Sequence, residues 1–322
     1  MRAAIVGTGF VARVHARALA QVGVEVVGMY GRGDDLAGVL DSERPDALHV
    51  CTPNALHAEQ ALAAVERGIH VVCEKPLAVS SEESARMVEA VAHAGLVGAT
   101  CYHVRGYPLV DRMRSTVAAG EVGELRLVHG RYLCDDVVVG AGGWRLRPES
   151  SGPSHVVADL GTHWLDAAEH VTGLRVLEVL ARFRGEPLED YAALLLRFEG
   201  GVDGSLLLSA GAAGRKNQLL FELEGTRGGL TWDQERPDEL LHRHADAPTQ
   251  IVLKDATSAL AHYPPGHGEG YGEAFESLFR EIYRAIAGEE HAPFPTFEDG
   301  HRGVRAVEAA VASARSGDGV EV

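Results

Sequence analysis

The stretch that decides the fold is MRAAIVGTGFVA, residues 1–12. An apolar run ends at Val6, and Gly7-Thr8-Gly9-Phe10-Val11-Ala12 follows and opens an alanine-rich segment that ends near Val22. This order of strand, GxGxxA turn and helix is typical of a dinucleotide-binding domain. Gly7 permits the tight turn, Gly9 lets the backbone approach a pyrophosphate, and the helix N-terminus supplies N–H groups. An ordinary glycine turn is the alternative, and the strand before it and the helix after it argue against that alternative.

The rest of the first half alternates short apolar runs with helical segments. We expect strands at residues 3–6, 24–30, 47–51, 70–73 and 96–102, and helices at 12–22, 57–67 and about 81–94. Strand–helix alternation with continuously apolar strands is typical of a parallel, doubly wound sheet. The sequence therefore predicts an α/β Rossmann domain, which we place at residues 1–121.

After about Gly123 the pattern changes to strands that follow one another. We expect strands at 124–133, 176–183, 191–198, 202–209, 219–224 and 229–232, and helices at about 155–171, 272–287 and 298–316. Runs of strands without intervening helices predict an α+β domain with a large, mainly antiparallel open sheet. We place this second domain at residues 122–322, and its last helix could pack back on the first domain.

The composition limits the partners. The 322 residues carry a formal net charge of -16, which argues against nucleic acid and anionic membrane surfaces as partners. No apolar run approaches the roughly 20 residues of a membrane span, and the N-terminus lacks a signal-peptide core, so we expect a cytoplasmic protein.

The cysteines and histidines show no metal-binding spacing. Cys51, Cys73, Cys101 and Cys134 stand far apart without a CxxC pair, which favours reduced and mostly buried thiols. The 16 histidines form no HExxH-type motif. We therefore predict no metal site, and we expect His242 and His244 to be surface residues of a polar loop.

The turn after the second strand bears on the choice of dinucleotide. An acidic residue there would bind both ribose hydroxyls of NAD, and an arginine would bind the 2′-phosphate of NADP. The turn reads Tyr30-Gly31-Arg32-Gly33-Asp34-Asp35, with Gly31 at the usual acidic position. Arg32 favours NADP, although it could also be a solvated turn residue, and Asp34 or Asp35 could fold back toward the ribose. The expected cofactor is NAD or NADP, with a lean to NADP.

Three further blocks carry chemical groups. Cys51-Thr52-Pro53-Asn54-Ala55-Leu56-His57 follows the third strand and Glu74-Lys75-Pro76 follows the fourth, at the strand ends where open α/β sheets bind their ligands. Downstream, Asp159-Leu160-Gly161-Thr162-His163 puts a carboxylate and an imidazole four residues apart, on one face of the expected helix.

Together these blocks resemble the Gfo/Idh/MocA family, named for glucose–fructose oxidoreductase, inositol dehydrogenase and a rhizopine catabolism protein. The resemblance runs along the whole chain, with family order and spacing of GTGFVARVHARAL, CTPNALH, VVCEKPLA, Arg105-x-x-Pro108, GWRLRPES and DLGTHWLD. The stretch GRKNQLLFELEGTRGGLTWDQERPDEL is similar to a sugar-active subgroup. One departure is Gly152-Pro153-Ser154-His155, where many members have three glycines before the aspartate. That departure puts analogies of substrate in doubt.

The resemblance implies an NAD(P)-dependent dehydrogenase or reductase that moves a hydride between nicotinamide and a secondary alcohol or ketone of a sugar, cyclic polyol or related compound. It maps the usual catalytic residues onto Lys75, Asp159 and His163. An imidazole with a pKa near neutrality suits proton exchange with the hydroxyl, so we expect His163 to be the general acid/base. Lys75 would hold the reacting oxygen, with Pro76 presenting it through a cis or sharply turned peptide.

The expected contacts form two groups. For the cofactor they are Gly7, Thr8, Gly9, Phe10, Val11, Gly31, Arg32, Cys51, Thr52, Pro53, Asn54, His57, Glu74, Lys75, Trp144 and Arg145. For the substrate they are Lys75, Tyr102, Arg105, His155, Asp159, His163 and His267. A purely structural role remains open for each of these residues taken alone, and for His267 it is equally supported.

Two other functions share this fold. One is a non-enzymatic, dinucleotide-sensing regulator, which loss of the catalytic lysine or histidine would indicate. The other is a glycoside-cleaving enzyme that uses NAD-assisted oxidation. We also expect a homodimer or homotetramer, because the open face of the second sheet would otherwise leave an apolar patch exposed.

Overall fold

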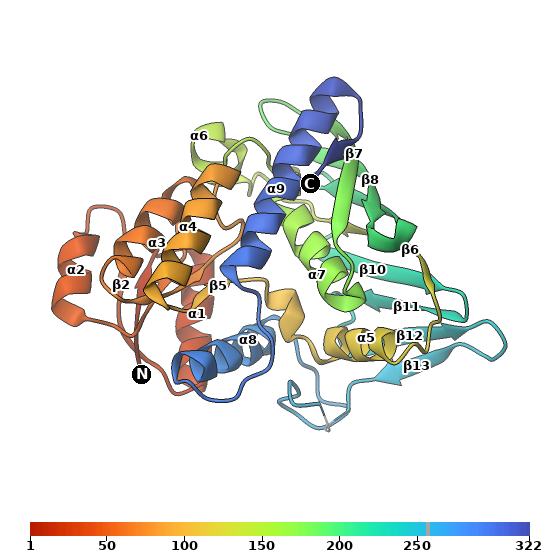
Figure 1. The fold of residues 1–322 in the computed structure, drawn as a ribbon, viewed down its shortest axis with the longest axis horizontal. Helices are drawn as coiled ribbons and strands as arrows, with labels where there is room; N and C mark the ends of the chain where they lie inside the picture. The colour runs from red at the N-terminus through yellow and green to blue at the C-terminus, as the bar shows by residue number, and fades with distance from the viewer. Residues whose placement is uncertain (256–257) are drawn as a thin grey trace. The chain divides into compact units, whose positions relative to one another are not determined.

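The computed structural model describes residues 1–255 and 258–322. The chain forms two compact units, each assembled from three segments (Figure 1). The first unit consists of residues Met1–Gly106, Glu149–Gly152 and Tyr271–Val304, and the second of Tyr107–Pro148, Pro153–Gly270 and Arg305–Val322.

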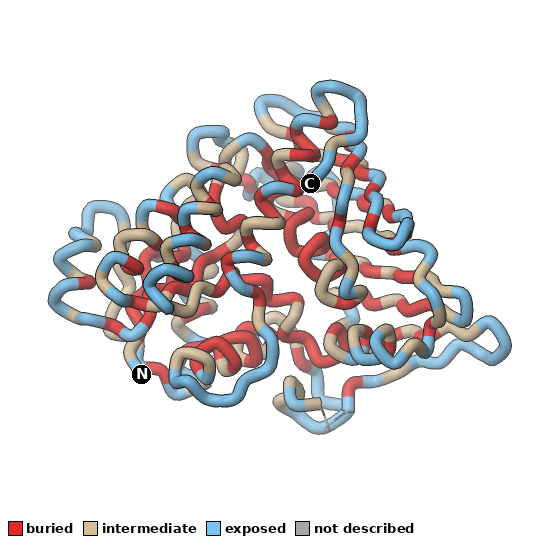
Figure 2. The backbone as a smooth tube through the Cα atoms, viewed as in Figure 1, coloured by how far each residue is buried: buried red, intermediate tan, exposed pale blue. Residues whose placement is uncertain are grey.

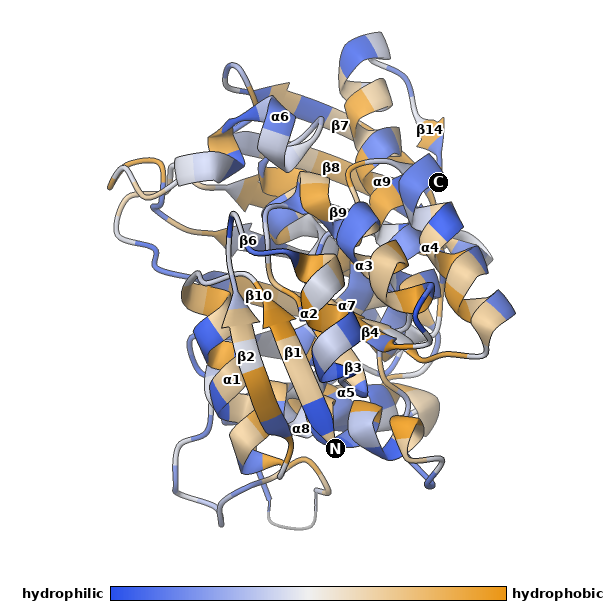
Figure 3. Ribbon diagram, turned by 90° about the vertical axis from the view of Figure 1, so that its left-hand side faces the viewer, coloured by the Kyte–Doolittle hydropathy of each residue, from blue (hydrophilic) through white to orange (hydrophobic). Residues whose placement is uncertain are grey.

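The first unit is built on a five-stranded parallel sheet of order β2-β1-β3-β4-β5. The central strands are mainly apolar and mostly buried because helices cover both faces of a doubly wound sheet. In Figure 3, β1 and β2 run side by side in the same direction. The strands are β1 (Arg2–Val6), β2 (Glu25–Tyr30), β3 (Ala47–Val50), β4 (His70–Cys73) and β5 (Gly98–Thr100).

Helices cover the two faces of this sheet and confirm the predicted Rossmann architecture. One face carries α1 (Phe10–Gln21) and α8 (Tyr271–Ile286), which contact each other. The other face carries α2 (Leu36–Glu43), α3 (His57–Val65) and α4 (Ser81–Ala94). The Ser80 side chain caps α4 by accepting the backbone N–H of Glu83. Short helical turns complete the unit: η1 (Asn54–Leu56), η2 (His103–Gly106) and α6 (Pro148–Ser151), whose first residue belongs to the second unit.

The second unit contains a nine-stranded sheet of order β13-β12-β11-β10-β6-β9-β8-β7-β14. Neighbouring strands are antiparallel except β6 and β9, which confirms the mainly antiparallel sheet. The strands are β6 (Leu125–Leu133), β7 (Val176–Arg184), β8 (Tyr191–Phe198), β9 (Asp203–Ser209), β10 (Gln218–Gly225), β11 (Gly228–Asp233), β12 (Glu239–His244), β13 (Gln250–Leu253) and β14 (Val320–Glu321).

The sequence interpretation of His242 and His244 as polar-loop residues is wrong. Both lie on β12, and His242 is buried. Their rings are tilted at 38° to each other, with centroids 4.0 Å apart. The strand was missed because its polar and charged residues conceal the period-2 pattern that its partner β11 imposes.

Helices α5 (Pro108–Ala118) and α7 (Thr162–Thr172) pack against one face of the second sheet. A π-helical segment, η4 (Val157–Gly161), precedes α7, so the single helix expected from residue 155 begins irregularly. Two short turns, η3 (Gly143–Leu146) and η5 (Glu199–Gly201), lie in connections. The long helix α9 (Phe297–Ser316) contributes residues to both units.

The other face of the second sheet exposes apolar side chains. Cross-strand pairing places Leu180 opposite Leu195, and Leu195 opposite Ser205. Leu207, two residues after Ser205 on β9, therefore lies on the same face of the sheet. Leu195 is 60% exposed and Leu207 is 37% exposed. The burial pattern in Figure 2 alternates along these strands, as expected for a sheet with only one covered face.

Two further expectations can be compared with the described residues. The four cysteine thiols are all buried and unbridged, as predicted. In the part of the chain that the structure describes, we find no helix with the length and apolar character needed to cross a bilayer.

Candidate dinucleotide site and catalytic residues

The glycine turn at the end of β1 has the geometry that its sequence predicts. Gly7 has a φ of +118°, and a Cβ there would lie 2.3 Å from the carbonyl oxygen of Cys51. A side chain at this position would therefore clash with the neighbouring strand's backbone. A Cβ at Gly9 would meet nothing within 4 Å, which leaves open space at the start of α1. Ala12 is fully buried, so a larger residue would push α1 off the sheet.

The N-terminus of α1 is suited to an anionic group. Among the described residues no side chain caps α1, and its first turn holds no acidic residue. The N–H groups there and the positive end of the helix dipole would favour a pyrophosphate. Thr8 and Phe10 are exposed beside this end, and Phe10 stacks on Tyr271 with ring centroids 6.2 Å apart. The residues present thus fit a dinucleotide.

Both acidic residues after β2 make local hydrogen bonds. Asp34 Oδ2 accepts the Gly31 N–H at 2.7 Å, and Asp35 Oδ1 accepts the Gly38 N–H at 3.1 Å, which caps α2. Arg32 is exposed on the same turn. The fold-back of either aspartate toward a ribose would require it to give up its bond to the backbone.

The His57 side chain supports the segment 51–57 that follows β3. This imidazole is fully buried, and its two nitrogens lie 2.9 Å from the carbonyl oxygens of Pro76 and Thr52. Burial lowers the pKa of His57, so the neutral ring donates to one carbonyl at a time. The Asn54 amide donates to the Ser151 carbonyl at 3.0 Å. Within this unit His57 ties the block after β3 to the turn after β4.

The Lys75 turn follows β4. Lys75 is partly exposed, and its peptide bond to Pro76 is cis, as predicted. Glu74 is buried, and its Oε2 accepts the Lys75 backbone N–H at 3.2 Å while its Oε1 lies 3.0 Å from His15 Nε2. Sequence reasoning expected Glu74 at the cofactor and did not single out His15. The one available signal was a histidine on the helix of the fingerprint, which predicts no contact by itself.

The residues after β5 are more buried than expected of substrate contacts. Tyr102 is fully buried, and Arg105 pairs with Asp299 at 3.3 Å. The neighbouring His103 stacks on Phe275 at 5.0 Å, and burial lowers the pKa of His103 to about 3. The substrate roles of Tyr102 and Arg105 stay predictions.

In the second unit, the predicted catalytic helix carries a charged pair at its irregular start. Asp159 Oδ2 lies 3.2 Å from Arg145 Nε, and the Arg145 guanidinium stacks over Trp144 at 4.8 Å. Arg145 and Trp144, predicted at the cofactor, are thereby placed beside a predicted catalytic carboxylate. His163, one turn further on, is buried.

Two residues that sequence reasoning missed accompany His163 and Asp159. The Tyr132 ring lies 6.2 Å from the His163 ring, and its hydroxyl donates to Asn217 Oδ1 at 2.9 Å. Burial, with a contribution from the Asp159 charge, raises the pKa of Tyr132. Tyr132 therefore stays protonated and keeps its hydrogen bond. These residues come from β6 and from the loop before β10, and only the sheet brings them to the helix.

A third missed residue, Glu189, anchors the chain before η4. Its buried Oε1 accepts hydrogen bonds from the Ser154 hydroxyl and from the backbone N–H groups of His155 (2.9 Å) and Val157 (3.2 Å). The His155 side chain is buried, and within the described residues its Nδ1 has no hydrogen-bond partner. The segment around Ser154 and His155, which replaces the three glycines of many family members, is thus held in place by Glu189.

His267 differs from the other predicted substrate contacts. It is exposed, and its carbonyl oxygen accepts a hydrogen bond from Lys254 Nζ at 2.7 Å. Lys254 is buried and forms an ion pair with Glu269, also at 2.7 Å. The Lys254 side chain thus supports the backbone of the loop that carries His267, and the role of the His267 ring stays a prediction.

The fold and the glycine turn define a dinucleotide-binding oxidoreductase, and comparison with known proteins agrees. Residues 32–102 match the family described as "Oxidoreductase family, NAD-binding Rossmann fold", and residues 110–231 match "GFO/IDH/MocA C-terminal domain". Levoglucosan dehydrogenase of Pseudarthrobacter phenanthrenivorans is 30% identical over 71% of this chain and 67% of its own length. The 1,5-anhydro-D-fructose reductase of Ensifer adhaerens is 33% identical over 70% and 71%. The chain belongs to the Gfo/Idh/MocA family of oxidoreductases.

Solved structures extend the similarity to the whole chain. A levoglucosan dehydrogenase in complex with NADH and levoglucosan has a TM-score of 0.93 at 27% identity, covering 100% of this chain and 99% of that one. An inositol dehydrogenase homolog from Azotobacter vinelandii in complex with NAD+ has a TM-score of 0.89 at 29% identity, covering 100% and 97%. The named relatives are thus dehydrogenases and reductases of sugars and related compounds, and the two solved structures contain NADH or NAD+.

Proposed function

We propose that this protein is an NAD(P)-dependent dehydrogenase or reductase acting on a secondary hydroxyl of a sugar or cyclic polyol. The observation that carries this proposal is the helix start formed by η4 and the first turn of α7. There Asp159 pairs with Arg145, and His163 is buried one turn further along the helix. These residues belong to a chain whose first unit has the open glycine turn of a dinucleotide site. The relatives named above act on polyhydroxylated substrates, which supports the same class here.

Oxidation of a secondary alcohol removes a hydride from carbon and a proton from oxygen. The Gly7–Gly9 turn and the N-terminus of α1 would hold the dinucleotide, which would supply the hydride acceptor in oxidation and the hydride donor in reduction. His163 takes the hydroxyl proton in oxidation and gives it back in reduction. The Lys75 ammonium donates a hydrogen bond to the reacting oxygen and stabilises the negative charge that develops on it. Asp159, held by Arg145, accepts a hydrogen bond from a neighbouring hydroxyl.

A substrate with several hydroxyl groups needs several polar contacts. We assign such contacts to His155, whose buried Nδ1 has no partner in the described part of the chain, and to Arg105, Tyr102 and His267. A site built to hydrogen-bond hydroxyl groups rejects analogues that lack them, because its buried polar atoms are then unpaired. We therefore expect deoxy analogues to be much poorer substrates than the parent sugar.

For the cofactor we propose NADP. Arg32 is exposed at the end of β2, and Asp34 and Asp35 are occupied with backbone N–H groups. Fluorescence titration with NADPH and NADH tests this. We expect Arg32→Ser to weaken NADPH binding about tenfold and NADH binding little, the loss of one charged hydrogen bond. Equal weakening of both, or wild-type preference for NADH, would contradict the NADP proposal without affecting the reaction type.

Turnover tests the reaction. We would screen sugars and polyols with both dinucleotides, and on the best substrate expect His163→Ala and Lys75→Ala to lower kcat about 10²- to 10⁴-fold. His93→Ala, an exposed histidine on α4, is the control and should retain wild-type kcat. Wild-type turnover by both active-site variants would refute the assigned roles. Nucleotide binding without turnover of any substrate would favour the regulator, and release of sugar without net NAD(P)H change would favour glycoside cleavage.

We also propose that the open sheet face is a subunit interface between copies of this chain, giving a homodimer or homotetramer. Leu127, Leu180, Leu195 and Leu207 lie on that face, and burying such a patch stabilises association. Light scattering should show an oligomer at micromolar concentration, and Leu195→Glu should dissociate it. Val139→Glu is the matched control because Val139 is similarly exposed, at 60%, but lies in a turn outside the sheet. A monomeric wild type would refute the interface.

A further inference from the structure

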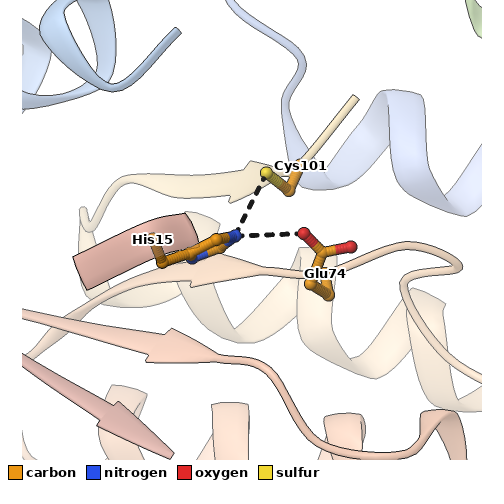
Figure 4. Close-up of side chains that lie close together, drawn as sticks. All are labelled: His15, Glu74 and Cys101. Carbon is orange, nitrogen blue, oxygen red and sulfur yellow. Dashed lines mark hydrogen bonds and ion pairs between the residues drawn. The ribbon is translucent and has the colours of Figure 1, made fainter. Parts of the chain in front are cut away.

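The side chains behind the Lys75 turn form a buried chain of hydrogen bonds that the proposed reaction does not use. His15 Nε2 lies 3.0 Å from Glu74 Oε1, and His15 Nδ1 lies 2.9 Å from His49 Nδ1. His49 Nε2 lies 3.0 Å from the Tyr283 hydroxyl. Figure 4 shows His15 pointing from α1 toward Glu74, with Cys101 beside the same nitrogen. The two histidines are fully buried.

The donors and acceptors along this chain can be assigned. Glu74 as a carboxylate only accepts, so His15 Nε2 donates to it. Burial lowers the pKa of His49 well below its usual value, and His49 is neutral with one N–H. If that N–H is on Nδ1, it donates to His15 and Tyr283 donates to Nε2. If it is on Nε2, it donates to Tyr283, and His15 donates from both nitrogens. In both assignments the bond to Glu74 is the same.

Glu74 depends on this bond to remain charged. Burial opposes its ionisation, but the hydrogen bond and charge of His15, with a smaller contribution from Lys75, hold the pKa of Glu74 below its usual value. The other titratable groups near this carboxylate are electrically neutral at neutral pH: the thiols, whose pKa burial raises well above 9.0, and two imidazoles, whose pKa burial lowers. They are Cys51, Cys73, Cys101, His57 and His103.

The same groups do not need a metal ion to explain their arrangement. His15, Glu74 and Cys101 bring three ligand atoms within 4.8 Å of one another. The distance of 3.0 Å between Nε2 and Oε1 is that of a hydrogen bond, which already satisfies both atoms. A hydrogen-bonded support is therefore the better description.

We propose that His15 is a positioning residue for Lys75. Its buried hydrogen bond keeps Glu74 ionised and oriented, so that Glu74 Oε2 holds the Lys75 backbone N–H and fixes the turn that presents the Lys75 ammonium. His15 also lies on α1, whose N-terminus is expected to bind the pyrophosphate, so one helix would serve both cofactor and lysine. This inference rests on the role of Lys75 in the proposed function, but the support itself can be measured without turnover.

The backbone N–H of Lys75 reports on the support directly. The chain has three lysines, at positions 75, 216 and 254, so ¹⁵N-lysine labelling gives three backbone amide signals. We expect His15→Leu to shift the Lys75 signal, because a neutral Glu74 is a weaker acceptor, and to leave the other two in place. His15→Gln, whose amide N–H can still donate, should restore most of the wild-type position. Tyr283→Phe is the matched control, because it removes the far end of the chain without touching Glu74.

Infrared spectroscopy reports on the charge of Glu74. At pH 6.5 we expect His15→Leu to gain a protonated-carboxyl band that disappears in the double variant with Glu74→Gln. Wild type and His15→Gln should lack that band. If His15→Leu does not fold, Glu74→Gln alone decides, because it removes the charge with little change of shape and should also shift the Lys75 signal.

Kinetics complete the test where the protein turns over a substrate. We expect His15→Leu to lower kcat about 100-fold, the cost of misplacing a reacting group by about 1 Å, with a much smaller change in KM. An unshifted Lys75 signal with no new carboxyl band in His15→Leu, or an unshifted signal in Glu74→Gln, would overturn the proposal. So would elemental analysis that finds a cation lost from the His15 and Glu74 variants. Absence of dehydrogenase activity would refute the proposed function alone, since the two spectroscopic measurements need no substrate.

Discussion

The two units support their predicted catalytic side chains in different ways. In the first unit, the neighbouring strand's backbone restricts the turn at Gly7, and the Glu74 side chain holds the backbone of the turn at Lys75. In the second, an irregular helix start carries Asp159 and His163, and a single carboxylate, Glu189, gathers three donors to hold it. Backbone sterics thus fix the glycine turn, and buried carboxylates hold the Lys75 turn and the helix start.

The charge at each support also differs. Glu74 accepts hydrogen bonds from His15 and from the Lys75 backbone N–H, and its own pKa is lowered in the folded protein. Glu189 receives a hydroxyl and two backbone N–H groups, which do not titrate at ordinary pH. The comparison teaches that the first support should depend on pH more than the second does.

The largest effect is expected at the backbone-fixed turn. Gly7→Ala should destabilise the fold by more than about 4 kcal/mol, because its Cβ would meet the Cys51 carbonyl oxygen at a positive φ. Gly9→Ala is the control: its Cβ has open space and ordinary φ, so it should unfold like wild type and lose only nucleotide affinity. Urea unfolding and NADPH titration measure both. Equal stability of the two variants would break the claim that sterics fix this turn.

The anchor of the second unit comes next. Glu189→Ala should cost about 3 kcal/mol, since buried donors without an acceptor cost about 1–3 kcal/mol each. It should also lower kcat, because the start of the catalytic helix loses its tie. Glu189→Gln keeps an accepting oxygen and should recover most of both losses. Thermal unfolding and steady-state kinetics on one preparation test this. A Glu189→Ala variant as stable and active as wild type would show that Glu189 does not hold the helix start.

A smaller effect should distinguish Glu74 from Glu189, namely the dependence of stability on pH. The pKa of Glu74 is lower in the folded protein than its ordinary value of 4.5. Its contribution to stability is therefore full above pH 4.5 and is lost as the pH falls through the lower folded pKa. Glu74→Gln should flatten the dependence of Tm on pH between about pH 5 and 3. If wild type and Glu74→Gln lose Tm in parallel over that range, the pH-dependent support does not lie at Glu74.

The smallest effect is expected where one of the three donors to Glu189 is removed. Ser154→Ala leaves the two backbone N–H groups on Oε1 and should cost about 1 kcal/mol, with kcat close to wild type. Thermal unfolding measures it. A loss as large as that of Glu189→Ala would mean that the hydroxyl alone, and not the gathering of donors, holds the helix start.

Much of the first unit follows from its sequence. Apolar strand runs and a GxGxxA turn predict β1 to β4 with α1, α3 and α4 closely, because these signals are local and a parallel sheet covered on both faces needs mainly apolar strands. In the second unit the strands β12 and β13 and the helix α5 were missed. Polar and charged residues conceal the alternation of β12, and β13 is a short edge strand.

The sequence by itself determined the class of protein and the chemical groups: a dinucleotide turn, a lysine after β4, and an aspartate and histidine at one helix start. Only the tertiary structure decided what supports them. His15 reaches Glu74 across 59 positions of chain, and Glu189 reaches Ser154 across 35. A single histidine or glutamate has no local pattern that reveals its partner, because the partner is chosen by how strands and helices pack and not by spacing along the chain.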